Sequence, residues 1–274
     1  MKNTKQLGII AGRGHYPFLI LREARKHGVE KIAVAAIEGD ASADLEKESD
    51  AMAWVYPGQI NRTIKFFQKQ GISEAVMVGQ VKPSRLFTGL RPDLRTMMML
   101  GKLKERNADT LFSAVCNEFQ KSGITILSAI SYLDDHLAGE GLLNKVKADK
   151  SRLQEAEYAF SVAKEVSRMD IGQSVVVKRG TILAVEGFEG TDKAIIRGGE
   201  LGRGGVTVCK VTKPNHDMRF DVPCIGMRTV DSLIQAKAKT LVVEAKRTLF
   251  IEKERVLEAL DRAKISVIGK TIQE

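Results

Sequence analysis

The sequence predicts an α/β protein: a Rossmann-like N-terminal domain, followed by a second α/β domain with a mixed sheet. Three observations indicate this class. Short apolar runs alternate with amphipathic segments along most of the 274 residues, which is the pattern of repeated strand–helix–strand units. A glycine-containing turn separates the first strand pattern from the first helix pattern. In the second half, two alternating runs joined by a tight turn indicate a hairpin.

The first strand–helix–strand unit carries a glycine turn, Gly12-Arg-Gly-His-Tyr-Pro17, directly after the apolar run 7–11. Pro17 suits the first turn of a helix, because its fixed φ angle and missing N–H are tolerated there. Small residues after a first strand let the backbone approach a phosphate at the helix N-terminus, so Gly12 and Gly14 are candidate substrate-binding residues. The match to a dinucleotide fingerprint is poor, because Pro17 stands at its third glycine position.

The rest of the first half continues this alternation. Strands are expected over 31–37, 53–56, 74–81 and 124–130, and helices over 17–27, 60–70 and 109–121. Lys82 follows the carboxyl end of one such strand, where open α/β sheets bind ligands, and it is a candidate substrate-binding residue. The run Met97-Met-Met-Leu100 is either core at helical spacing or flexible apolar surface able to accept an acyl chain.

Between residues 131 and 149 the periodic pattern weakens, and we expect the connection between domains there. The predicted domains are 1–132 and 150–274, with 133–149 as a linker. Helices are expected over 150–169, from 191 or 192 onward, and over 229–239 and 253–263. Strands are expected over 174–178, 181–186, 205–211, 241–245, 248–252 and 265–269.

Charge and cysteine content limit the classes of function and the compartments that we expect. The net charge of +9 favours an anionic partner, which can be nucleic acid, a phosphorylated metabolite or an acidic membrane surface. Three cysteines without a Cys-x-x-Cys pair argue against a disulfide framework and a zinc site. No apolar run approaches the roughly 18 residues that span a bilayer. We therefore expect a cytoplasmic protein.

The stretch from Lys210 to Gly226 holds the densest polar cluster, with Lys213, His216, Asp217, Arg219 and Asp221. In an extended chain, two aspartates four residues apart place their carboxylates on one face. Two acids, two cations and a histidine can handle a phosphorylated substrate with a divalent metal. The alternative interpretation is a charged turn held by local ion pairs.

Four motifs occur in order: Leu7-Gly-Ile-Ile-Ala-Gly-Arg-Gly14, Met169-Asp-Ile-Gly-Gln-Ser-Val-Val-Val177, Ala184-Val-Glu-Gly-Phe-Glu-Gly-Thr-Asp192 and Lys213-Pro-Asn-His-Asp-Met-Arg-Phe-Asp-Val-Pro223. With them, the chain resembles the LpxI-type UDP-2,3-diacylglucosamine pyrophosphatases over essentially its whole length. The glycine turn alone is weak evidence, whereas the two C-terminal motifs at this spacing are highly specific.

The resemblance implies hydrolysis of UDP-2,3-diacylglucosamine to UMP and 2,3-diacylglucosamine 1-phosphate, a step of lipid A synthesis. It also implies Mg²⁺ and a homo-oligomer such as a homodimer. Because a substrate with two acyl chains sits in a bilayer, we expect the basic surface to make peripheral contact with the anionic inner membrane. Asp221 and Asp217 are the implied catalytic and metal-binding residues. The candidate substrate-binding residues are Gly12, Gly14, Lys82, Gln173, Thr191, Lys213 and Arg219.

Two positions depart from the family pattern. His216-Asp217 stands where the family usually has Gln-Asp, and Asn107-Ala-Asp109 stands where it usually has Gly-Asp-Asp. Glu186, Glu189 and Asp192 can join a metal site, or serve as helix caps and surface charge.

Two rival functions remain open from the sequence. One is a Rossmann-type oxidoreductase with a nicotinamide cofactor, against which the incomplete glycine fingerprint argues. The other is a basic nucleic-acid-binding protein, although an aromatic content of 5% offers few stacking platforms.

Overall fold

The α/β class is confirmed by the computed structural model, which describes residues 5–81, 91–103, 108–214 and 216–271. Contacts divide the chain into two compact units. Unit 1 consists of Met1–Leu133 together with Asp217–Asp221, and unit 2 of Asp134–His216 together with Val222–Glu274. The chain therefore passes from one unit to the other at three points, two of which flank the short segment 217–221.

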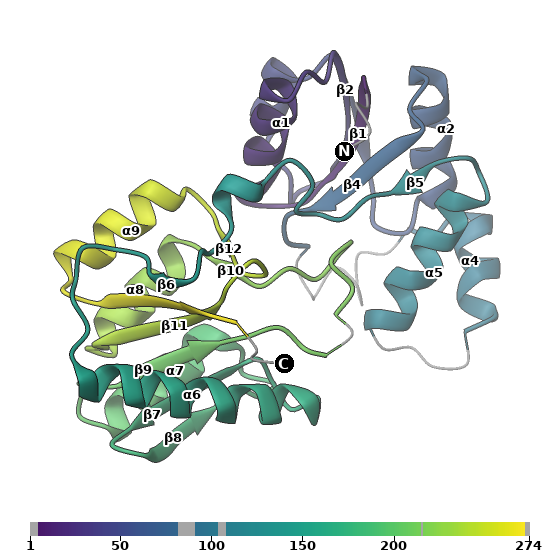
Figure 1. Ribbon diagram of the computed structural model, residues 1–274. Helices are drawn as coiled ribbons and strands as arrows, with labels where there is room; N and C mark the ends of the chain where they lie inside the picture. Colours follow the sequence, from purple (N-terminus) through teal and green to yellow (C-terminus); the bar gives the residue numbers. More distant parts are fainter. Residues whose placement is uncertain (1–4, 82–90, 104–107, 215, 272–274) are drawn as a thin grey trace. The chain divides into compact units, whose positions relative to one another are not determined.

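Unit 1 is built on a parallel five-stranded sheet (Figure 1). Its strands are β1 (Gln6–Ala11), β2 (Lys31–Ile37), β3 (Ala51–Val55), β4 (Glu74–Val78) and β5 (Thr125–Ile126). They lie in the order β3-β2-β1-β4-β5. In this order of doubly wound sheets, the chain runs outward in opposite directions from β1 and β4. The carboxyl ends of these two neighbours therefore mark the topological switch point.

The helices of unit 1 cover the sheet with apolar faces set by 3.6-residue periodicity. The structure contains α1 (Tyr16–Lys26), the 3₁₀ turn η1 (Ala43–Glu48), α2 (Ile60–Gln70), α4 (Leu94–Gly101) and α5 (Ala108–Gln120). Ile64 and Phe67 of α2, Met99 of α4 and Phe119 of α5 share one core with two alanines of β2, Ala33 and Ala35. As expected, Pro17 lies in the first turn of α1, and Gly71 ends α2 with a φ of 76°.

The loops after β1 and β4 are joined to each other at the switch point. The Gly12 N–H donates to the Val78 carbonyl at 2.8 Å, and Arg13 and Gln80 exchange two backbone hydrogen bonds of 2.7 and 3.1 Å. A Cβ on Gly12 would lie 2.7 Å from the Gln80 carbonyl oxygen. Gly12 is therefore required by the close approach of two protein backbones. Gly14 differs, because its φ is +102° and a Cβ there would meet nothing within 4 Å.

Unit 2 contains a six-stranded mixed sheet in the order β6-β13-β11-β9-β7-β8. Its strands are β6 (Gly141–Leu142), β7 (Ser174–Lys178), β8 (Thr181–Val185), β9 (Thr207–Lys210), β11 (Thr240–Glu244) and β13 (Ser266–Lys270). The three central strands β13, β11 and β9 are parallel, while the β7–β8 hairpin and β6 run antiparallel to their neighbours. A separate parallel pair joins β10 (Cys224–Ile225) to β12 (Leu249–Phe250).

Strand alternation divides the core of unit 2 between the two faces of its sheet. Val175 and Cys209 pack with α6 (Lys150–Arg168), whereas Val176 and Val208 pack with the helices of the other face. Those helices are α7 (Thr191–Leu201), α8 (Met227–Gln235) and α9 (Lys253–Arg262). Unit 2 also contains a short 3₁₀ turn, η2 (Asp134–His136). Figure 1 shows α6 on one side of this sheet and α8 and α9 on the other.

Some predicted boundaries were wrong. The strand expected over 124–130 pairs only at Thr125–Ile126, because the chain turns at 128–133 through Ser131 and Leu133 N–H bonds. No bounds were predicted for α4, although helical spacing was one interpretation of the run Met97–Leu100. The linker expected at 133–149 differs from the observed division, in which residues from Asp134 onward belong to unit 2. There β6 adds an edge strand to β13.

The contact between the two glycine loops generates a stability prediction. Gly12→Ala should lower the free energy of unfolding by about 1–3 kcal/mol, because the new methyl group would overlap the Gln80 carbonyl. Gly101→Ala is the matched control, since a Cβ there meets nothing within 4 Å. Urea unfolding checks both variants. Equal stability of Gly12→Ala and the wild type would show that the loops separate without cost.

Candidate active site

The cluster around Asp217 and Asp221 forms a turn, so the expectation of an extended segment was wrong. The Asp217 carbonyl accepts hydrogen bonds from the N–H groups of Phe220 at 3.3 Å and Asp221 at 3.2 Å. The chain had to leave the extended conformation to close these bonds. Aspartates four residues apart are still neighbours, because one helical turn also brings i and i+4 together.

The turn is attached to the sheet edge of unit 1. The Met218 carbonyl accepts a hydrogen bond from the Ala129 N–H at 2.7 Å and one from the Ser128 hydroxyl at 3.3 Å. The Phe220 ring stacks on Phe112 of α5, with centroids 5.1 Å apart and planes inclined by 20°. Residues 128 and 129 follow β5, so the turn lies at the carboxyl edge of the parallel sheet. The glycine loop after β1 opens at this same edge.

Within the turn, the Asp217 carboxylate holds Arg219. The Arg219 Nε lies 2.9 and 3.1 Å from the two carboxylate oxygens, and its Nη2 lies 2.6 Å from Oδ2. The Arg219 backbone N–H also donates to Oδ1 at 3.1 Å. These hydrogen bonds raise the pKa of the Arg219 guanidinium further above its usual value. Both oxygens of Asp217 are thus engaged by one arginine, which fixes that cation at the sheet edge.

Neighbouring groups complete the electrostatics of this edge. Cys116 of α5 is buried, and desolvation raises the pKa of its thiol to about 11, although the nearby Arg219 charge lowers it. Cys116 therefore stays a neutral thiol at physiological pH and contributes packing. Asp221 is half-buried at the end of the turn.

The carboxylates at this edge give a minimal donor set for a metal ion. In the part of the chain that the structure describes, no three His, Cys, Asp or Glu residues gather closely enough to hold an ion. Mg²⁺ does not need such a cluster, because it usually takes one or two carboxylates and completes its shell with water and substrate phosphates. Asp221 fits that pattern, whereas Asp217 would have to exchange bonds with Arg219.

The remaining candidates lie in unit 2. Lys213 forms an ion pair with Asp170. The Gln173 carbonyl accepts a hydrogen bond from the Val211 N–H at 2.9 Å, which joins β7 to the end of β9. The Thr191 hydroxyl donates to Glu186 Oε1 at 2.8 Å. Gln173 and Lys213 thus lie close to the chain that leaves β9.

The N-terminus of α7 corrects one expectation. Gly190 occupies the N-cap position with a φ of 85°, so neither Thr191 nor Asp192 caps the helix. Asp192 instead pairs with Arg228 at 2.9 Å, and Glu189 pairs with Arg197. In the structure these two acids are ion-pair partners of arginines. Lys82 and Asn107 lie outside the described residues, and the side chain of Asp109 is likewise not described.

Sequence reasoning missed the group that anchors the chain just before Lys213. Glu244 ends β11 with 2% exposure, and its Oε2 accepts hydrogen bonds from the Thr212 N–H at 2.8 Å and hydroxyl at 2.5 Å. Lys164 of α6 lies 3.1 Å from both Glu244 Oε2 and the Thr212 carbonyl. Thr212 is fully buried. The sequence did contain one indication of this buried anchor, a single carboxylate at the end of the apolar run Thr240-Leu-Val-Val-Glu244.

We expect Glu244→Ala to lower the free energy of unfolding by about 3 kcal/mol, because it leaves the half-buried Lys164 ammonium and the buried Thr212 donors without their carboxylate. Adding Lys164→Met should recover part of that loss, since the uncompensated charge is then removed as well. A double-mutant cycle in urea measures the coupling. Strictly additive effects of the two substitutions would contradict the assignment of a coupled pair.

Comparison with known proteins finds a family match for both halves of the chain. Residues 6–136 match the family model described as the LpxI N-terminal domain, and residues 139–268 match the LpxI C-terminal domain. The UDP-2,3-diacylglucosamine pyrophosphatase LpxI of Caulobacter vibrioides is 31% identical over 283 residues. That alignment covers 98% of this chain and 99% of the relative.

Solved structures add no functional argument. The biotin carboxylase domain of Hydrogenobacter thermophilus 2-oxoglutarate carboxylase aligns over 86% of this chain with 10% identity and a TM-score of 0.29. The biotin carboxylase subunit of a pyruvate carboxylase aligns over 85% with 13% identity and the same TM-score. The chain spans 41% and 40% of those two proteins.

Proposed function

Because the chain belongs to the LpxI family, we propose that it hydrolyses the pyrophosphate bond of UDP-2,3-diacylglucosamine. The observation that carries the proposal is the 31% identity to a pyrophosphatase of that name across nearly the full length of both chains. The products would be UMP and 2,3-diacylglucosamine 1-phosphate, and the reaction would serve lipid A synthesis.

The turn at Asp217–Asp221 supports roles for three residues in this reaction. A pyrophosphate resists hydrolysis because its negative oxygens repel a nucleophile. Arg219, fixed by Asp217, would stabilise negative charge on the transferring group. Asp221 would act at the reacting centre by orienting the attacking water. Asp217 would then act mainly through Arg219, as a positioning residue.

We also propose Mg²⁺ as the cofactor, held by Asp221 and, where it exchanges its bonds with Arg219, by Asp217. When bound, Mg²⁺ would neutralise charge on the two phosphates. The residues fit such an ion because a single carboxylate at a sheet edge can suffice for it when substrate phosphates supply further oxygens. Gly14 leaves open space at the same edge, whereas Gly12 is occupied by protein backbone.

A substrate with two acyl chains resides in a bilayer, and we propose peripheral contact with the anionic face of the inner membrane from the cytoplasmic side. The charge of +9 supports that contact. In the ranges that the structure describes, no helix has the length and apolar character to cross a bilayer. A homodimer is proposed on the family resemblance alone.

Release of UMP from UDP-2,3-diacylglucosamine in detergent micelles, with and without Mg²⁺, tests the function. We expect UMP and the lipid 1-phosphate in equal amounts, and a loss of turnover after chelation that added Mg²⁺ restores. Intact substrate under both conditions would overturn the proposal. Unchanged turnover in chelator would overturn the metal assignment alone.

Asp221→Ala should reduce kcat by roughly 10²-fold or more, because a group that aligns water or a metal acts mainly in the transition state. KM should change little. Asp231→Ala is the matched control, since Asp231 is an exposed aspartate on α8. Steady-state kinetics separate kcat from KM. A fully active Asp221→Ala protein would remove Asp221 from the site even if the family activity holds.

A further inference from the structure

Helix α4 presents an apolar outer face. Leu94, Met97 and Met98 are 72%, 58% and 55% exposed, and their i, i+3, i+4 spacing places them along one side of the helix. The opposite side is also filled, because Thr96 and Met99 are buried. A surface helix normally turns polar residues outward. The outward apolar stripe therefore needs an explanation other than packing among the described residues.

The surroundings of that stripe are cationic. Among the described side chains of residues 91–103 and 110–121, the cations are Arg91, Arg95, Lys102 and Lys121, and the carboxylates are Asp93 and Glu118. Both carboxylates are engaged. Asp93 accepts N–H bonds from Thr96 at 2.9 Å and Asn61 at 2.6 Å, and Glu118 binds Arg95 and Lys121, each at 2.7 Å. The local charge that faces solvent is thus positive.

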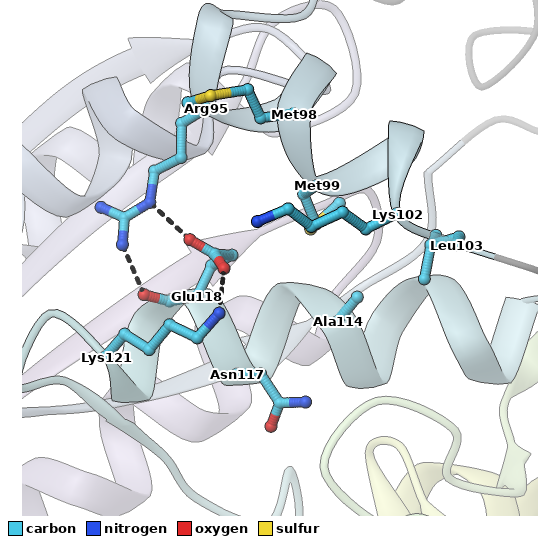
Figure 2. A pocket seen from close by; sticks show the side chains of 9 residues that line it. All are labelled: Arg95, Met98, Met99, Lys102, Leu103, Ala114, Asn117, Glu118 and Lys121. Carbon is cyan, nitrogen blue, oxygen red and sulfur yellow. Dashed lines mark hydrogen bonds and ion pairs between the residues drawn. The ribbon is translucent and has the colours of Figure 1, made fainter.

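A groove between α4 and α5 also combines apolar and cationic side chains. Figure 2 shows Arg95 and Lys121 converging on Glu118, with Lys102 beside them. The groove has a volume of about 210 Å³, and Met98, Met99, Leu103 and Ala114 supply its apolar wall. Lys102 makes no ion pair with another residue of the described ranges. Its ammonium group is available to an anion from outside the chain.

We propose that α4 is the element that docks the protein onto an anionic lipid surface. Leu94, Met97 and Met98 would enter the interfacial region of the bilayer, while Lys102 contacts lipid phosphates. Unbranched methionine side chains suit a fluid surface, because they adapt to irregular partners. The inference rests on the proposed function for its purpose, since an enzyme that acts on a lipid substrate has to reach the membrane that holds it.

A second copy of the chain is a poorer occupant of this face. Three apolar side chains fall well short of the roughly 800 Å² per partner that a stable interface buries. A two-fold contact would also bring the surplus cations of two copies together, since isologous interfaces pair identical patches. A lipid surface supplies the complementary negative charge instead.

The test is vesicle binding by the full chain. The triple variant L94Q/M97Q/M98Q should lose at least tenfold in affinity for vesicles of phosphatidylglycerol and phosphatidylcholine, measured by co-sedimentation at low salt. The variant K102Q should weaken binding less and reduce its dependence on salt. M169Q/L201Q is the matched control, because Met169 and Leu201 are 60% and 62% exposed in unit 2.

Four outcomes would overturn the proposal. The first three are no vesicle binding by the wild type, unchanged vesicle binding by the triple variant, and an equal loss of vesicle binding in M169Q/L201Q. The fourth is a wild-type dimer that the triple variant converts to monomer without a change in vesicle binding. Circular dichroism and thermal melting confirm that the variants fold. UMP release in detergent micelles should be the same in the triple variant and the wild type. If the protein binds vesicles through α4 but does not release UMP from the substrate, the proposed function is rejected. The assignment of α4 as a docking surface then still holds.

Discussion

The hydrogen bond from the Ala129 N–H to the Met218 carbonyl ties the charged turn to the sheet edge of unit 1. The residues before and after that turn belong to unit 2, so the turn would have no fixed relation to the glycine loop without an anchor of this kind. Stacking of Phe220 on Phe112 adds an apolar contact to the same attachment. Backbone and aromatic contacts thus fix the turn that carries Arg219 and Asp221.

Two carboxylates with opposite surroundings organise the cations near this segment. Asp217 is half-exposed and holds Arg219 within its own turn. Glu244 is buried, and it holds Lys164 and the backbone of Thr212 from two other elements. An exposed pair of this kind contributes little to stability, whereas a buried one becomes costly when one partner is removed. The first pair therefore matters chiefly for orientation, and the second for fixing the chain that leads to Lys213.

The two glycines of the first loop show why a motif does not assign a role by itself. Both were expected to admit a phosphate. Gly12 lies against the Gln80 carbonyl, so its missing side chain serves the packing of two loops at the switch point. Gly14 has open space beside it, and its positive φ favours glycine whatever binds there. Of the two glycines, Gly14 is the one with open space beside it.

The sequence by itself determined the α/β class, most of the strands and helices, and the segment that carries the charged cluster. These follow from local periodicity, from Pro17 and Gly71 at helix ends, and from residue chemistry. The tertiary structure decided which partner each polar group takes. Asp217 turns to Arg219, Glu244 reaches Thr212 across 32 positions, and Met218 meets a segment some 90 positions earlier. Local patterns do not encode such pairings, because they depend on which chain segments the packed core brings together. The outward apolar face of α4 is known for the same reason only from the structure.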